Sequence, residues 1–287
     1  MKFVKFATIL IGLLLILATV ALGVEAEHGT DAGHSGPPHL PSFVGMLSEA
    51  TGWTWLEHWV NVIYAFLIAG IFSIVAVMVS RKKDMVPGPF QNFMEICVEG
   101  MYNFIYSILG KDARRYVPFL GTLFFYILAM NLMGLVPGGH SPSTSINITA
   151  SLAILVFLYS QYIGISRQGF GGWVDHLIGA PRDVVSWALV PLMLPLHIIG
   201  ELAKPFSLAV RLFGNITGED VLVAAFVGLG LAIMSGLHSP IGLPINIPFI
   251  LLGTLLSIIQ ALVFTLLSTI YILMMLPHHE HEPDAHH

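Results

Sequence analysis

The chain has 287 residues, of which 55% are apolar and only 10% are charged, and its mean hydropathy is +0.81. Several segments exceed the roughly 18–20 apolar residues that cross a bilayer, which excludes a soluble domain and predicts an all-α polytopic membrane protein. The net charge of −5 indicates no nucleic-acid partner, and the single cysteine, Cys97, excludes an intrachain disulfide.

Residues 1–26 begin with two lysines and continue as an apolar run that ends in small residues. This pattern is typical of a signal peptide, and an uncleaved extra N-terminal helix is the alternative. Residues 27–57 are expected to form an extracytoplasmic tail, and residues 277–287 a His-rich cytoplasmic tail. No metal site is expected in either tail, because the irregular histidine spacing implies no fixed geometry.

The membrane domain is expected over residues 58–276. Its first helix, 58–80, is followed by three consecutive cations, which places that end in the cytoplasm. The less apolar segment 87–110 has the pattern of an amphipathic helix lying on the membrane surface. Helices over 116–136 and 145–166 form the next two crossings, and a loop that contains Gly171 and Gly172 is expected after the second.

The last two helices are expected to be long. Residues 206–237 form about 32 residues of helix, roughly 48 Å against an ~30 Å hydrocarbon core, so this helix should be steeply inclined. It pairs with a helix over 249–276 as a hairpin. Three prolines are expected to break the element before it, namely Pro191, Pro195 and Pro205. The count is about five membrane helices plus one interfacial helix.

Lysine and arginine together total 12, and eight of them fall in loops that lie on one side of this topology. Those eight occupy 81–83, 111–115, 167 and 182. Assigning all of them to the cytoplasm satisfies the positive-inside rule and places the N-terminal tail outside.

Lys204 and Arg211 are the cations left in strongly apolar surroundings. A cation at bilayer depth costs about 2.5–3.5 kcal/mol, and a guanidinium cannot escape this cost by losing its proton. Glu201 and Glu219 lie about 15 Å and 12 Å from Arg211 along a helix, too far for a direct pair. Three long apolar segments contain neither Asp nor Glu, namely 117–136, 146–166 and 249–276. Arg211 is therefore either solvated by amides and water or paired with a carboxylate of another chain, and we favour the second.

The helical projection places Arg211 on a narrow face of small and polar residues, where a partner helix packs closely. The face comprises Lys204, Ser207, Asn215 and Gly218. Glu201 and Glu219 fall about 80° to one side of Arg211 as two flanking acidic groups, whereas Asp220 points about 180° away. On the last helix, Gly253, Ser257 and Gln260 share a face, which brings Gln260 opposite Arg211.

The run K-P-x-S-L-x-x-R-L-F-G-N from Lys204 to Asn215 resembles the signature of subunit a of the F-type ATP synthase membrane sector. The M-N-L-M-x-L-x-P run that starts at Met130 is similar to that family's third helix. The N-x-T motif at 147–149 resembles its fourth helix, and Gln260-Ala261 its last. The motifs occur in matching order over roughly residues 50–276.

The resemblance implies that Arg211 faces the essential carboxylate of a rotating ring of c subunits, and that 87–110 contacts the b subunits of the peripheral stalk. Two aqueous half-channels would exchange protons with the ring. The site residues that it implies besides the arginine are His197, Glu201, Lys204, Ser207, Asn215, Glu219, Asp220, Asn131 and Gln260. An outer station would use Glu219 or Asp220 with Asn131 and Asn215. An inner one would use His197 and Glu201, with Lys204 partly pairing Glu201 at a spacing of three residues.

Several alternatives stay open at this stage. The family's outer carboxylate commonly lies nine residues after the arginine, at Asp220, whereas the projection favours Glu219. Members of the family also carry His or Glu where this chain has Gly253. A lone buried asparagine such as Asn131 is more often a helix-packing residue than part of a proton path, although the resemblance favours the path. The Thr149 and Ser151 hydroxyls could line an aqueous entrance or bond back to their own helix.

The competing function is an ion-coupled secondary transporter, because midplane charges and broken helices occur there too. No repeat relates the two chain halves, which disfavours it. No G-x-x-x-x-G-K-[ST] run exists, so neither a bound nucleotide nor catalysis is expected on this chain, and no cofactor is indicated. The ring carboxylate's ligands, and not this chain, would select H⁺ or Na⁺.

Overall fold

The computed structural model describes Phe43 and Met46 together with residues 59–81, 88–136, 138–178, 184–236 and 245–276. All regular structure within these residues is helical. Five stretches are long and apolar enough to cross a membrane, namely Val60–Met78, Pro89–Met133, Ile146–Asp175, Val190–Ile233 and Ile247–Met274. The predicted class, an all-α polytopic membrane protein, is confirmed. The segment 1–26, the tail 277–287 and most of 27–57 lie outside the described residues.

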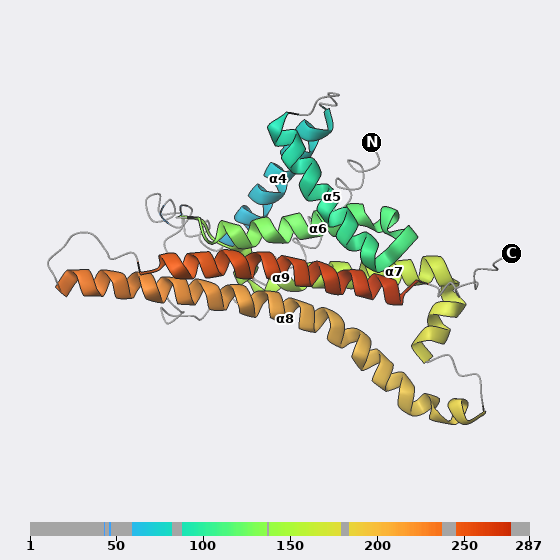
Figure 1. The fold of residues 1–287 in the computed structure, drawn as a ribbon. Coiled ribbons are helices and arrows are strands. Elements are labelled where there is room, and N and C mark those ends of the chain that lie inside the picture. Colours follow the sequence, from blue (N-terminus) through green and yellow to red (C-terminus); the bar gives the residue numbers. More distant parts are fainter. Residues whose placement is uncertain are drawn as a thin grey trace.

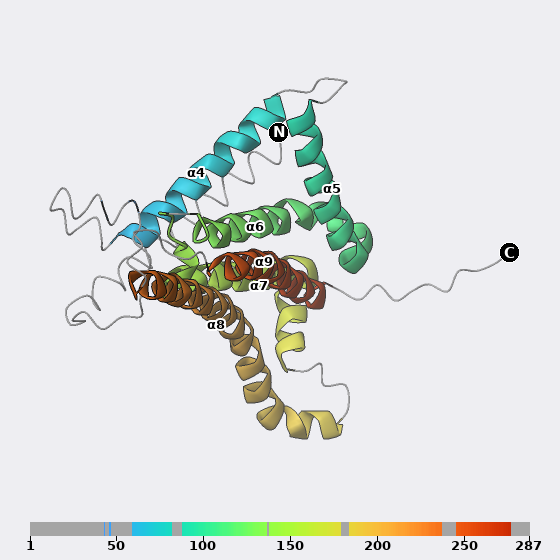
Figure 2. The ribbon, with the colours of Figure 1, turned by 60° about the vertical axis from the view of Figure 1, so that its left-hand side comes forward.

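Helices α4 (Val60–Arg81), α5 (Pro89–Leu109) and α6 (Ala113–Met133) form three sides of a triangle (Figure 2). A proline at the first helical position of α5 starts this helix without losing a hydrogen bond. The 3₁₀ turn η1 (Gly110–Asp112) joins α5 to α6. The segment predicted as a separate amphipathic helix is thus a separate helix, and its place on the membrane surface stays a prediction.

The second half of the chain contains the longest helices. The 3₁₀ turn η2 (Pro142–Thr144) leads into α7 (Ile146–Ile178). Helix α8 (Val184–Gly236) has 53 residues and bends midway, and α9 (Ile247–Met274) returns beside its second half (Figure 1). The expected hairpin is therefore present, and its inclination in a membrane stays a prediction.

The core lies between α6, α7, α9 and the middle of α8. Its largest fully buried side chains include Tyr116, Phe119, Phe264, Leu208 and Leu212. The ring of Phe119 stacks on Tyr159 with centroids 4.0 Å apart, which joins α6 to α7. Burying each such side chain stabilises the bundle by roughly 1.5–3 kcal/mol where water is the reference. The helices that carry the polar residues below are therefore fixed against each other.

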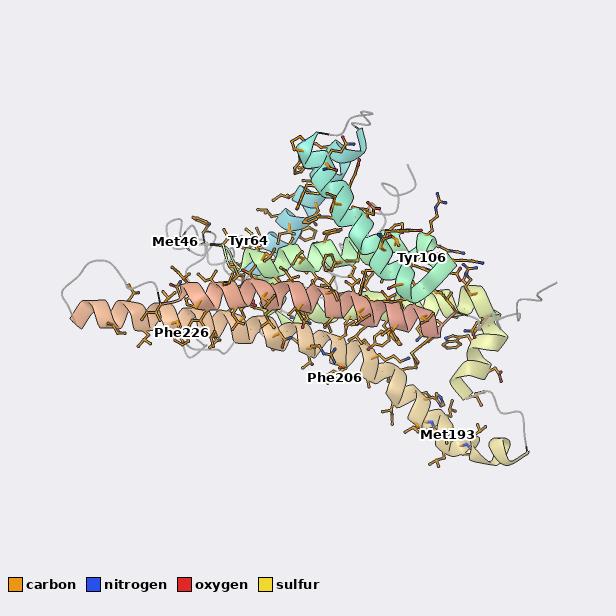
Figure 3. The ribbon with its side chains drawn as sticks, in the orientation of Figure 1. Met46, Tyr64, Tyr106, Met193, Phe206 and Phe226 are labelled. Carbon is orange, nitrogen blue, oxygen red and sulfur yellow. The ribbon has the colours of Figure 1, made fainter. Side chains whose placement is uncertain are left out.

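The first part of α8 contrasts with this core, because residues 191–200 are exposed with the exception of Leu194. Figure 3 shows Met193 on this arm, Phe206 near the bend, and Phe226 where α8 and α9 run side by side. There the Phe226 ring stacks on Phe249 at 3.7 Å between centroids. The bend in α8 thus separates an exposed arm from a packed section.

Two sequence-based expectations are wrong. The prolines do not break the early part of α8, because the helix runs through Pro191, Pro195 and Pro205 without interruption. Each proline removes one backbone N–H but keeps a helical φ, so it bends the helix instead of ending it. Likewise, α7 does not end near Arg167 but continues to Ile178.

The break in α7 lies at Gly169, where φ is 75° and ψ is 166°, a region essentially restricted to glycine. The chain beyond it turns so that Trp173 Nε1 donates to Gln161 Oε1 at 2.7 Å. Gln168 Nε2, just before the break, donates to the Met275 carbonyl at 2.9 Å. The two bonds fix the kinked end of α7 to its own first part and to the end of α9.

Substituting Gly169→Ala is expected to destabilise the protein by about 1–3 kcal/mol, because a Cβ strains this backbone conformation. The measurement is thermal denaturation in detergent, followed by circular dichroism. The matched control is Gly171→Ala, two residues on in helical backbone with open space around the added methyl, which should be neutral or slightly stabilising. Equal effects of the two substitutions would contradict the assignment of the kink to Gly169.

Candidate functional site

Arg211 lies exposed on the packed section of α8. Ser207, Gly214 and Gly218 are exposed beside it, and a Cβ added to either glycine would meet nothing within 4 Å. Among the described residues, Arg211 makes neither an ion pair nor a hydrogen bond. The structure therefore leaves a permanent cation beside exposed small residues, with no carboxylate of the described residues paired with it.

Two residues expected on this face turn inward instead. Asn215 is half-buried, and its Nδ2 donates to Gln260 Oε1 of α9 at 2.5 Å. Lys204 is also half-buried and pairs with Glu201 three residues earlier, as its spacing predicted. The inward turn follows from burial, because a polar side chain between packed helices needs a partner there. The exposed polar face is therefore narrower than the projection indicated.

Glu219 lies between α8 and α9 and is only 7% exposed. The Ser257 hydroxyl lies 3.5 Å from Glu219 Oε2, at the long limit of a hydrogen bond. A Cβ added to Gly253 would collide with the Glu219 carboxylate. The three residues predicted to share a face of α9 thus all meet α8, and the missing side chain at Gly253 makes room for this carboxylate.

Asp220 occupies different surroundings, near the turn between α6 and α7. A Cβ added to Gly134 would lie 3.2 Å from Asp220 Oδ1 and 2.9 Å from the Ser141 Cβ. Close by in the chain, Asn131 is 2% exposed and its Oδ1 accepts from Ser143 Oγ at 2.8 Å. The adjacent acids therefore face different helices, Glu219 towards α9 and Asp220 towards the turn after α6.

Two buried amide groups in this region lack a hydrogen-bond partner among the described residues, Asn131 Nδ2 and Gln260 Nε2. A buried amide N–H left without a partner costs about 1–3 kcal/mol, and ordered water is the usual remedy. The two groups lie in the parts of the structure that hold Asp220 and Glu219. This is the arrangement expected of a hydrated interior.

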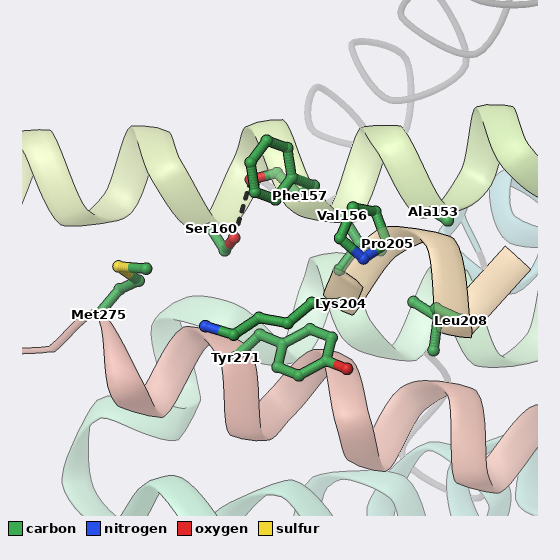
Figure 4. A pocket seen from close by; sticks show the side chains of 9 residues that line it. All are labelled: Ala153, Val156, Phe157, Ser160, Lys204, Pro205, Leu208, Tyr271 and Met275. Atoms are coloured by element: carbon green, nitrogen blue, oxygen red, sulfur yellow. Dashed lines mark hydrogen bonds between the residues drawn. The ribbon is translucent and has the colours of Figure 1, made fainter. Parts of the chain in front are cut away.

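A second polar cluster, at the bend of α8, joins this helix to α7 and α9. Its members are Gln161, Trp173, Glu201, Lys204 and Tyr271. Gln161 Nε2 of α7 donates to Glu201 Oε2 at 3.0 Å, and Trp173 fixes the same glutamine from its other side. Lys204, the ion-pair partner of Glu201, extends beside Tyr271 with its Nζ 5.6 Å from the ring centroid (Figure 4). The Glu201 carboxylate is therefore bound on both oxygens.

His197 does not join this cluster. It lies on the exposed arm of α8, one helical turn before Glu201, and its Nδ1 lies 3.1 Å from the Met193 carbonyl. The structure thus brings together Glu201 and Lys204, but it leaves His197 facing outward.

Sequence reasoning missed Gln161 and Trp173, which hold Glu201. A glutamine in the middle of an apolar helix was the available signal for the first.

The Thr149 and Ser151 hydroxyls bond back to carbonyls of their own helix, at 3.0 Å and 2.7 Å. Within the described ranges, no three His, Cys, Asp or Glu side chains are placed to hold a metal ion. The His-rich tails lie outside those ranges.

Comparison with known proteins identifies the family. A family model described as the ATP synthase A chain matches residues 59–273. The chain belongs to the ATP synthase subunit a family. ATP synthase subunit a of Protochlamydia amoebophila is 46% identical over 241 residues, which cover 83% of this chain and 89% of that relative. The corresponding protein of Oleidesulfovibrio alaskensis is 40% identical over 247 residues, or 85% of this chain and 98% of the relative.

A third relative, named ATP synthase subunit a 3 in Pelobacter propionicus, is 39% identical over 73% of this chain and 84% of its own length. The matched region contains Arg211, the polar residues around Glu219 and Asp220, and the polar cluster around Glu201. Membership of this family favours subunit a over an ion-coupled secondary transporter.

Substituting Gly253→Ala is expected to cost about 1–3 kcal/mol of folding stability, because the new methyl group overpacks against the buried Glu219 side chain. Shortening the acid as Glu219→Ala should remove most of that penalty, so a double-mutant cycle of thermal stability should show coupling. Gly70→Ala on α4, where a Cβ meets nothing within 4 Å, is the matched control. Additive effects of the two substitutions would exclude the contact.

Proposed function

We propose that this chain is the ion-channel subunit of an F-type ATP synthase, in which Arg211 faces the essential carboxylate of a rotating c-subunit ring. The supporting observation is the exposed guanidinium without an ion pair among the described residues. The exposed small residues one and two helical turns from it are Ser207, Gly214 and Gly218. A helix of a partner can approach such a face closely, and small residues are enriched where membrane helices pack.

The chemistry follows from the environment of the ring carboxylate. In lipid the acid must be neutral, because burying its anion is too costly. Facing Arg211 it ionises, because an opposite charge stabilises the anion. The acid therefore releases its proton on one side of the arginine and binds another on the other side. Arg211 also repels a hydronium ion that would otherwise pass directly between the two half-channels.

The outer half-channel would use the carboxylate of Glu219 or Asp220, together with the amides of Asn131 and Asn215. The support is chemical, because buried amides in this region need water. Glu219 meets α9, whereas Asp220 meets the turn after α6, so the two acids mark two possible courses of the channel.

The inner half-channel would open near the bend of α8, at His197, Glu201 and Lys204. The Glu201 carboxylate is bound by both Lys204 and Gln161, which favours a fixed charge there over a mobile proton carrier. His197 is exposed one helical turn before Glu201, which leaves it open to exchange with water. In this proposal the Glu201 carboxylate is a fixed negative charge beside the proton path, and His197 supplies protons to that path or accepts them from it.

The chain spans the bacterial inner membrane with its N-terminal tail outside and its C-terminus in the cytoplasm. Its partners are the lipid bilayer, the c-subunit ring and the b subunits of the peripheral stalk, which would contact α5. The chain binds no cofactor, and ATP chemistry resides on other subunits. The transported ion is H⁺, with Na⁺ as the alternative set by the ring.

Replacing Arg211 with alanine is expected to abolish ATP-driven proton pumping, because the ring acid then has no cation to stabilise its ionised form. The measurement is acidification of inverted membrane vesicles that contain the assembled complex. The matched control is Arg167→Ala, which removes a half-exposed arginine paired with Asp112 at 3.6 Å, an interaction of about 0–1 kcal/mol. Normal pumping by Arg211→Ala would remove the hypothesis.

Single cysteines at Ser207 and at Gly218 are expected to form crosslinks with a c-type subunit, because both positions are exposed on the Arg211 face. The background variant carries Cys97→Ser, which removes the native thiol. The control is Ile74→Cys, an exposed position on α4, which should give no such product. Mass spectrometry of the crosslinked bands decides, and bonds formed only within this chain would favour a carrier.

A further inference from the structure

The turn between α6 and α7 carries a histidine that the proposed function does not use. His140 is half-buried, and its Nε2 lies 2.6 Å from Asn61 Oδ1 of α4 and 3.5 Å from Thr144 Oγ1. The Asn61 carbonyl oxygen can only accept a hydrogen bond, so Nε2 carries a hydrogen in this arrangement. The imidazole is thereby held at the junction of α4 with the turn.

The same junction is held by Tyr64. Its hydroxyl donates to the Gly138 carbonyl at 3.1 Å, and its ring lies 6.2 Å from that of His140 between centroids. Tyr64 of α4 is the titratable side chain that faces the imidazole among the residues that the structure describes. Asp220 of α8 lies beyond Ser141. Histidine is the side chain that ordinarily gains and loses a proton near neutral pH, with a pKa of about 6.5.

Hydroxyl groups continue from His140 towards the interior. Thr144 Oγ1 donates to the Ser141 carbonyl at 2.7 Å, and Ser141 and Ser143 are fully buried. Ser143 in turn bonds to the buried Asn131 side chain. These hydroxyls donate to carbonyl and amide oxygens and not to one another, and Ser141 Oγ donates to the Met130 carbonyl at 3.0 Å. A proton that passes this way therefore needs water between them, to which each hydroxyl can donate and from which it can accept.

The turn reaches Asp220 because Gly134 has no side chain. A Cβ at this position would lie 2.9 Å from the Ser141 Cβ and 3.2 Å from Asp220 Oδ1. The buried turn and the carboxylate therefore share one small space at the end of α6. A half-buried titratable group, a set of hydroxyls and a half-buried acid thus follow one another from the periphery inward.

We propose that His140 is the proton-collecting group of the half-channel that serves Asp220. The imidazole binds a proton from the aqueous phase and becomes imidazolium. It then releases a proton to water held beside the Thr144 and Ser141 hydroxyls, this water passes a proton to the Asp220 carboxylate, and the imidazole returns to the neutral form. Asn61 holds the ring in place as a positioning residue. This inference rests on the proposed function, because it assigns the mouth of the same channel.

The test uses the assembled complex in vesicles, with ATP synthesis driven by an imposed proton gradient and the pH of the proton-supplying compartment varied. His140→Gln keeps a hydrogen-bonding side chain but cannot titrate. The rate of ATP synthesis of this variant is expected to fall roughly tenfold near pH 8, because the imidazole there collects scarce protons. Near pH 5.5, where hydronium is abundant, it should fall less than about twofold. A wild-type rate and pH profile in His140→Gln would overturn the proposal.

Tyr64→Phe is the matched control, because it loses a hydrogen bond in the same turn but no group that titrates near neutral pH. It should keep the wild-type pH profile, and a shift as large as that of His140→Gln would reduce the effect to packing and overturn the proposal. Should His140→Gln fail to assemble, His140→Ala is measured with and without imidazole in the proton-supplying compartment. Restored synthesis supports the relay, and no restoration overturns it.

Arg211→Ala in the same vesicles separates the two claims. Loss of synthesis in Arg211→Ala together with wild-type behaviour of His140→Gln removes only the role of His140. Normal synthesis in Arg211→Ala removes the proposed function itself.

Discussion

A guanidinium that cannot lose its proton lies exposed on α8, and the three acids that the structure describes on the same helix are held elsewhere. Glu201 is bound by Lys204 and Gln161, Glu219 lies in the space left by Gly253, and Asp220 faces the turn after α6. None of these carboxylates pairs with Arg211 within the described structure. A charge so placed in lipid is costly, and it becomes favourable when a second molecule supplies the anion.

The surrounding helices keep these charges apart. The packed section of α8 is buried against α7 and α9 by residues such as Leu208 and Leu212, so the opposite face of the same helix is left for Arg211. Bonds from Asn215 to Gln260 and from Ser257 towards Glu219 fix α9 in register with α8. Moving one helix by a turn would break all of them together. The positions of the acids relative to the arginine are therefore a property of the helix packing.

Much of this arrangement is readable from the sequence, because hydropathy and helical periodicity are local properties. The helices, the hairpin of α8 with α9, the Lys204–Glu201 pair and the shared face of Gly253, Ser257 and Gln260 all follow from spacing along one helix. Features that depend on contacts between helices cannot be read from the sequence in this way. Pro205 bends α8 without ending it, Gly169 breaks α7 where Gly171 and Gly172 do not, and Asn215 turns inward to reach Gln260. Trp173 and Gln161, 12 residues apart on a kinked helix, gave no local signal of their bond to each other.

The glycines on the exposed side of α8 also determine how a neighbour can travel across it. Interlocking side chains make helices settle into discrete grooves, and each step from one groove to the next has an activation barrier. Next to Arg211, Gly214 and Gly218 present bare backbone with open space around it. A neighbour that crosses this surface meets no side chain at these two positions, which lowers the steric part of that barrier beside the arginine.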